Sequence, residues 1–224
     1  MLIKIRNSIT FISIIISIIC FSLCFWQIKR LHWKKDLIKN IENAYNSEPI
    51  NINSLKGNLI NFKFKKIYSE GSFLEEKSMF LGPRTYKNKV GYNLITPFLI
   101  KNNKYILINR GWIKEKKKFE NQNKNYRIEG LLKEANVKNI FTPNNSINDN
   151  LWFYINTAEM AEFTDLNFID NVFIDLIKID ENKNLTLINS SMPKIINNHL
   201  QYSITWGILG VVFLFMNYIY IKKR

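Results

Sequence analysis

YSITWGILGVVFLFMNYIYI, residues 202–221, is an uncharged run long enough to cross a lipid bilayer as one helix, because a bilayer core takes about 20 apolar helical residues. A second apolar run, ITFISIIISIICFSLCF at residues 9–25, comes close to that length. All charged residues lie between or just outside these runs. The sequence therefore predicts transmembrane helices at residues 8–27 and 200–221, which enclose one large domain at residues 28–199.

Basic residues set the predicted orientation of this hairpin. Lys222–Arg224 directly follow the second run, whereas residues 195–201 contain no Lys or Arg. The carboxyl end is then expected in the cytoplasm, and two crossings place the amino end there too. Lys29 and Arg30 on the other flank oppose this orientation, but long loops translocate largely regardless of charge. The central domain is predicted to be periplasmic.

The first run is expected to remain as an anchor. It is longer than the apolar part of most signal peptides, and no small-x-small cleavage triplet follows it. The few residues before it leave no room for a mitochondrial presequence. We therefore expect a multi-pass protein of a bacterial inner membrane, with the lipid bilayer as its first partner.

The residue composition excludes several classes of function. The formal net charge is +14, but the Lys residues are scattered among Asn and Ile, which argues against a nucleic-acid partner. A general compositional drift toward Lys, Asn and Ile explains the charge, and attraction to anionic lipid headgroups is the alternative. Cys20 and Cys24 lie in the first run, and His32 and His199 flank the domain at its ends. The domain thus lacks the residues of Cys-His or Ser-His-Asp nucleophiles and of zinc sites. No enzyme and no metal site are predicted; a carboxylate-based enzyme stays open.

The domain is predicted to be α+β. Apolar spacing of three and four between residues 29 and 46 indicates that the first helix continues beyond the membrane. Short runs bounded by Gly, Asn and Pro then predict strands. These are residues 57–68, 79–86, 91–100, 105–113, 126–134 and 171–179, with a hairpin turn at 101–104 and loops at 139–150 and 180–193.

One helix interrupts the strands. Asn156 followed by Glu159 has the spacing of a capping box and predicts a helix of about two turns. With no internal repeat, the domain is expected to be one mostly antiparallel sheet, curled into an open barrel.

Four segments in order resemble the Surfeit locus protein 1 family, the membrane-anchored assembly factors of cytochrome c oxidase. They are Trp26-Gln27 with Arg30, Trp33 and Lys34; Gly82-Pro83-Arg84 with Gly91 and Thr96-Pro97-Phe98; INRGWI at residues 108–113; and HLQYSITW at residues 199–206. The chain departs from the family pattern at Cys24, where Gly is usual, and at Lys114, where Pro is common. A Gly at the first position would allow closer helix contact.

The resemblance implies a non-enzymatic assembly factor. It implies haem a as the candidate cofactor, and oxidase subunit I and other oxidase assembly factors as partners. Within it, His199 is expected to be an axial haem ligand, with Arg30 near a propionate. An interfacial histidine that only anchors its helix is the alternative. An adaptor for an unrelated envelope complex is the rival function.

Small and polar residues form a stripe on each predicted membrane helix, and such stripes mark helix contacts in lipid. The stripes comprise Ser13, Ser17, Cys20, Cys24 and Gln27 on the first helix, and Ser203, Gly207 and Gly210 on the second, with His199 and Asn217. Chance scatter is the alternative. Cys20 and Cys24 could also hold copper, although buried cysteines usually pack as small hydrophobes.

Three residues of the domain are candidate partner contacts. Arg110 and Trp112 alternate to one side of a predicted strand, where they form either a docking surface or part of the core. Arg84, after Gly82-Pro83, either fixes a turn or recognises an acidic group.

Overall fold

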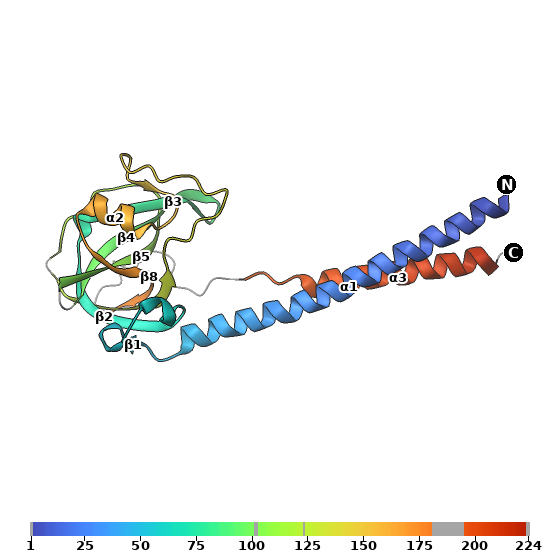
Figure 1. Ribbon diagram of the computed structural model, residues 1–224, viewed down its shortest axis with the longest axis horizontal. Coiled ribbons are helices and arrows are strands. Elements are labelled where there is room, and N and C mark those ends of the chain that lie inside the picture. Colours follow the sequence, from blue (N-terminus) through green and yellow to red (C-terminus); the bar gives the residue numbers. More distant parts are fainter. Residues whose placement is uncertain (1, 101–102, 123, 181–194, 223–224) are drawn as a thin grey trace. The chain divides into compact units, whose positions relative to one another are not determined.

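The computed structural model describes residues 2–100, 103–122, 124–180 and 195–222. Residues 101 and 102 of the predicted turn at 101–104, and residues 181–193 of the predicted loop at 180–193, lie outside the described residues. The chain divides into two compact units, residues 1–40 with 193–224 and residues 41–192. Figure 1 labels the elements. These are α1 (Leu2–Asn46), β1 (Ile50–Asn51), β2 (Lys66–Phe73), β3 (Met79–Tyr86), β4 (Lys89–Ile100), β5 (Lys104–Ile113), β6 (Tyr126–Glu134), β7 (Leu151–Trp152), α2 (Thr157–Thr164), β8 (Phe168–Ile179) and α3 (His199–Lys222).

The first unit is a pair of apolar helices. α1 runs without interruption through both the first apolar run and the amphipathic segment to Asn46, as the sequence predicted. α3 covers the second run. Both helices are long and apolar enough to cross a membrane by length and composition. The membrane boundaries predicted at residues 8–27, 28–199 and 200–221, and the orientation, stay predictions.

The second unit is an α+β domain with one mixed sheet. The strand order is β1-β2-β6-β8-β5-β4-β3-β7. Pairings β2–β6, β6–β8, β3–β4 and β4–β5 are antiparallel, whereas β1–β2, β3–β7 and β5–β8 are parallel. β2 also pairs with β4, so the sheet curls back on itself (Figure 1). The mostly antiparallel open barrel predicted from the sequence matches this mixed sheet only in part.

The predicted strands agree with the structure except for the first. Residues 57–68 were expected to form a strand, but Leu59–Phe62 form a short 3-10 helix and β2 begins only at Lys66. The Asn58 side chain accepts a hydrogen bond from the backbone N–H of Ile60 and caps this turn. The prediction for α2 is confirmed, since Asn156 caps the helix at Ala158 and Glu159.

Buried apolar side chains form clusters on both faces of the sheet. One cluster contains Ile67 and Phe98, and a second contains Trp152 of β7 and Met160 of α2. β5 passes through both clusters, since Ile108 belongs to the first and Leu107 to the second. The core therefore fixes the strands that carry the candidate residues Arg84, Arg110 and Trp112.

Candidate functional site

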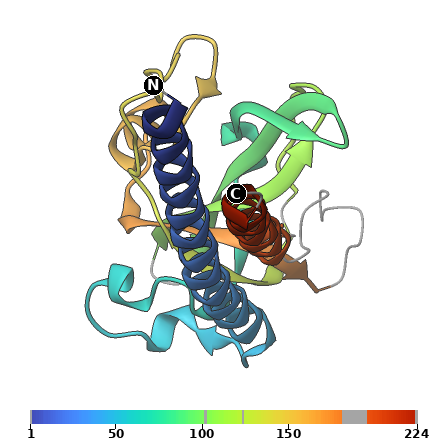
Figure 2. The same cartoon turned by 90° about the vertical axis from the view of Figure 1, so that its right-hand side faces the viewer.

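The small residues predicted to line a helix contact lie between α1 and α3. The hydroxyl of Ser13 donates to the carbonyl of Phe213 at 3.1 Å, and that of Ser17 donates to the carbonyl of Gly210 at 3.3 Å. The two helices run side by side and antiparallel (Figures 1 and 2). A side chain on Gly210 would meet the ring of Phe21 at 3.0 Å. Close packing of α1 on α3 therefore depends on the missing side chain of Gly210.

The same contact continues toward the other end of α3. Cys20 and Ser203 are buried, and a Cβ on Gly207 would lie 3.5 Å from the Sγ atom of Cys24. Gly207 thus supplies the small residue opposite Cys24, where the family pattern has Gly on the first helix. Both cysteines carry free thiols. Among the described residues, no group of three or more His, Cys, Asp or Glu side chains is placed to hold a metal ion.

His199 meets Gln27 at the start of α3. The Nδ1 atom of His199 lies 2.7 Å from the Oε1 atom of Gln27. An amide oxygen only accepts hydrogen bonds, so Nδ1 of His199 is the donor in this contact. Gln27 is buried and His199 is partly exposed. In a neutral imidazole that donates from Nδ1, Nε2 is the atom that can bind a metal.

An apolar groove of about 480 Å³ lies one turn from His199 along the helix pair. It is lined by Cys24, Ile28, Ser203, Ile204, Gly207, Ile208, Val211 and Val212. On α1, Arg30 is exposed, and its guanidinium lies 4.1 Å from the centre of the Trp33 ring. The helix pair thus offers an imidazole, an apolar groove and an exposed cation near one end.

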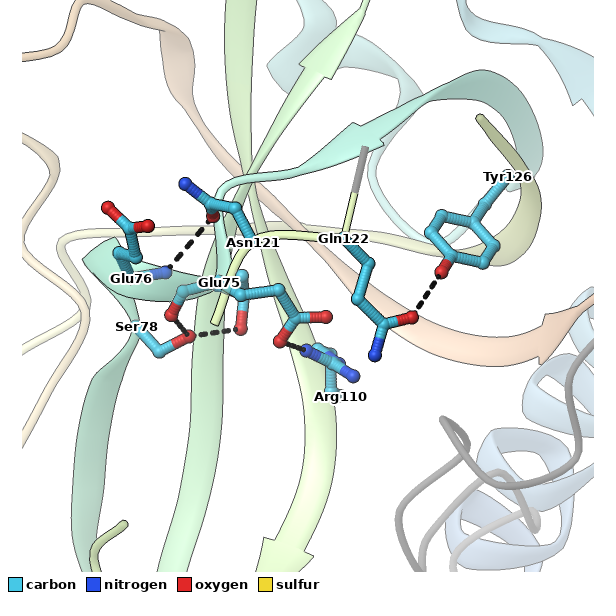
Figure 3. A network of polar contacts seen from close by, with 8 residues as sticks. Glu75, Glu76, Ser78, Arg110, Asn121, Gln122 and Tyr126 are labelled. Carbon is cyan, nitrogen blue, oxygen red and sulfur yellow. Dashed lines mark hydrogen bonds and ion pairs between the residues drawn. The ribbon is translucent and has the colours of Figure 1, made fainter. Parts of the chain in front are cut away.

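Arg110 lies in the interior of the domain. It is 3% exposed, and its Nη1 atom is 2.6 Å from the Oε2 atom of Glu75, itself 3% exposed (Figure 3). The guanidinium also lies 4.6 Å from the centre of the Phe73 ring. Tyr126 is close by. Burial raises the pKa of its hydroxyl, and the negative charge of Glu75 raises it further. The hydroxyl donates to Gln122, seen beside Arg110 in Figure 3.

Trp112 lies apart from Arg110 because the strand bulges between them. Asn109 pairs with Ile95 of β4, and Trp112 pairs with Asn93. Two residues of β5, Arg110 and Gly111, therefore lie opposite the single residue Leu94, and this arrangement is a β-bulge. Gly111 has a φ of 111°, which favours glycine. Trp112 donates from Nε1 to the carbonyl of Arg84 at 3.0 Å. The structure thus brings Trp112 to Arg84 and gives Arg110 a separate partner.

Sequence reasoning did not single out Glu75. It stands in the run Leu74-Glu75-Glu76-Lys77, which resembles an exposed polar turn. The turn is a short 3-10 helix, and only Glu75 of its two carboxylates faces inward. A buried arginine always calls for a buried acceptor, but the sequence does not say which carboxylate supplies it.

Comparison with known proteins agrees with the architecture. The profile of the SURF1 family matches residues 14–211. A SURF1-like protein of Rickettsia conorii is 30% identical, covering 97% of this chain and 91% of the relative. A SURF1-like protein of Rickettsia prowazekii is 31% identical over 95% of this chain and 89% of the relative. Surfeit locus protein 1 of Takifugu rubripes is 24% identical over 83% of this chain and 85% of the relative. The match extends through both helices and the sheet between them, and the chain therefore belongs to the SURF1 family.

Proposed function

We propose that this protein is a non-enzymatic assembly factor for cytochrome c oxidase in a bacterial inner membrane. Membership of the SURF1 family, which is a family of oxidase assembly proteins, supports this role. The two apolar helices support a membrane location, with the α+β domain in the periplasm. The protein assists the insertion of haem a into subunit I, or stabilises subunit I while other assembly factors act.

The observation that carries the haem part of this proposal is the pair formed by His199 and Gln27. The Gln27 oxygen accepts a hydrogen bond from Nδ1 of His199, which leaves Nε2 of a neutral imidazole as the ligating atom. Imidazole is a usual axial ligand of haem iron, and haem supplies a flat apolar ring with anionic propionates. The residues present fit such a group: His199 would hold the iron, and Gly207 and Ser203 leave apolar space beside it.

Arg30 completes the fit. Its side chain is exposed on α1, one turn beyond Gln27, and it stacks on Trp33. No ion pair of Arg30 with an acidic residue is found in the described part of the chain. A guanidinium without a carboxylate partner suits a propionate, which it can bind through parallel hydrogen bonds.

Deleting the gene tests the assembly role. Membranes of the deletion strain should lose most oxidase activity and the absorbance of assembled haem a, while a plasmid copy of the wild-type protein restores both. Normal oxidase in the deletion strain would overturn the proposal and favour an adaptor for another envelope complex.

Purified protein from cells that make haem a tests the ligand. The wild-type protein should show a low-spin haem spectrum, and His199→Ala should weaken or shift it while far-UV circular dichroism stays the same. His32→Ala is the matched control, since the partner of His32 in the described part of the chain is the carbonyl of Ile28 on its own helix. An unchanged spectrum in His199→Ala removes this residue from the site. A wild-type protein without haem would leave only the stabilisation of subunit I.

A further inference from the structure

A cleft of about 410 Å³ on the domain opens beside Arg84, away from the buried pair of Arg110 and Glu75. Half of the twelve residues that line it carry large apolar or aromatic side chains: Leu81, Val137, Phe153, Tyr154, Ile155 and Phe173. We call this the Arg84 cleft. Its size is that of a site for one or two side chains of a partner.

The charge of Arg84 is not neutralised within the described residues. Its Nη1 and Nη2 atoms donate to the backbone carbonyls of Pro83 and Phe153 at 3.2 and 3.5 Å. Glu134 also lines the cleft, but its carboxylate is ion-paired with Lys63 at 3.3 Å. Arg84 is exposed at the mouth of the cleft, and partial desolvation by the surrounding side chains lowers its pKa. A guanidinium with spare donors in a cleft lined by both polar and apolar groups favours a carboxylate as ligand.

The cleft is held in shape before anything binds. Trp112 is buried and fixes the backbone of Arg84 through its indole N–H. The side-chain oxygen of Asn145 accepts hydrogen bonds from the backbone N–H groups of Phe153 and Tyr154 at 2.8 and 3.4 Å. Since these walls are already ordered, a ligand loses little free energy to ordering them.

A rigid apolar turn borders the Arg84 cleft. Asn139 and Thr142 line the cleft, and the Thr142 N–H donates to the Asn139 carbonyl at 3.1 Å. The Phe141 N–H donates to the Asn139 side chain at 2.9 Å. Between them, Ile140 is 96% exposed and Phe141 is 91% exposed. Two large apolar side chains are thus presented to solvent by a turn with its own hydrogen bonds, and covering them would be favourable.

We propose that the Arg84 cleft and the turn at residues 139–142 together dock an apolar segment of a protein partner that carries an Asp or Glu. The carboxylate pairs with Arg84, and the apolar neighbours of that carboxylate cover Ile140 and Phe141. Arginine and aromatic residues around a concave centre are typical of protein interfaces. A lipid surface would cover the turn but leave the concave cleft unfilled. This surface defines the chemistry of the partner. Which protein the partner is depends on the oxidase assembly role proposed above.

Photo-cross-linking in living cells tests the docking surface. The full chain carries p-benzoylphenylalanine at position 141, and the cross-linked peptide is identified by mass spectrometry. We expect a peptide with an Asp or Glu beside apolar residues. Arg84→Glu should lower the yield about tenfold, because it replaces attraction to the partner carboxylate by repulsion, and changing that acid to Lys in the partner should restore it. Lys56→Glu makes the same charge change at an exposed site outside the surface and should leave the yield unchanged.

Each other result overturns the docking surface. Cross-links to lipid alone would assign the turn to the bilayer. A protein cross-link whose yield is unchanged in Arg84→Glu would show that the cleft takes no part in docking. The oxidase measurements in the deletion strain separate the two proposals. Normal oxidase activity in the deletion strain, together with a cross-link yield that the charge swap restores, would refute the oxidase role but support the docking surface. Lost oxidase activity without a protein cross-link would refute only the docking surface.

Discussion

At the scale of single residues, Arg110 has an environment that the sequence could not decide. A buried guanidinium is tolerated only when its charge is paired, and Glu75 supplies the carboxylate at 2.6 Å. Phe73 covers the other side of the charge. Apolar periodicity detects strands but not which distant carboxylate completes an ion pair, so the sequence left core and interface open. A direct role of Arg110 in partner contact stays a prediction, and its burial makes stability the first property to measure.

We expect Arg110→Ala to destabilise the domain by about 3–5 kcal/mol, because it leaves the Glu75 charge buried without a partner. Denaturant unfolding of the purified chain in detergent, followed by near-UV circular dichroism, measures this. A double variant, Arg110→Leu with Glu75→Leu, removes both charges and should recover part of the loss. Unchanged stability and abundance with lowered oxidase would instead assign Arg110 to partner contact.

At the scale of elements, the sequence predicted those strands whose patterns are local. The bounds of Met79–Tyr86 and Tyr126–Glu134 are the same in the prediction and in the structure. The strand expected from Gly57 failed because Asn58 caps a 3-10 turn, and alternation of apolar residues cannot detect a side-chain cap. The spacing of small residues likewise predicted the stripes on α1 and α3. It could not predict which carbonyl accepts the hydrogen bond of each serine.

The contact between α1 and α3 can be tested by a disulfide. A Cβ at position 207 lies 3.5 Å from the Sγ atom of Cys24, so Gly207→Cys should form an intramolecular disulfide with Cys24 on mild oxidation in membranes. Mass spectrometry after proteolysis detects the linked peptides. Ile208→Cys places the thiol at an exposed neighbouring position and should not link. Linkage from position 208 instead of 207 would contradict this register of the two helices.

At the scale of the whole molecule, the α+β class and the two terminal helices could be predicted, but the sheet topology could not. β8 is parallel to β5, and β2 pairs with both β6 and β4. These pairings join segments far apart in the sequence, and no local pattern encodes which distant strands meet. The orientation in the membrane is a separate prediction, because it depends on the basic residues after α3 and not on the fold.

Reporter fusions test this orientation. Alkaline phosphatase inserted after Lys118, in an exposed stretch between β5 and β6, should be active, because this enzyme matures only outside the cytoplasm. A green fluorescent protein fused after Arg224 should fluoresce, since the basic tail is expected to stay in the cytoplasm. The reverse pattern would place the domain in the cytoplasm and remove the periplasmic role.

The central position of β8 has a consequence for biosynthesis. β8 lies between β5 and β6 in the sheet, although it is the last strand of the described chain. While the ribosome is still making residues 168–179, the facing edges of β5 and β6 have no neighbour, and such edges invite aggregation or proteolysis. The next helix starts at His199. Nascent chains interrupted before β8 should therefore be targets for envelope quality control, and completion of the domain closely precedes emergence of the second membrane helix.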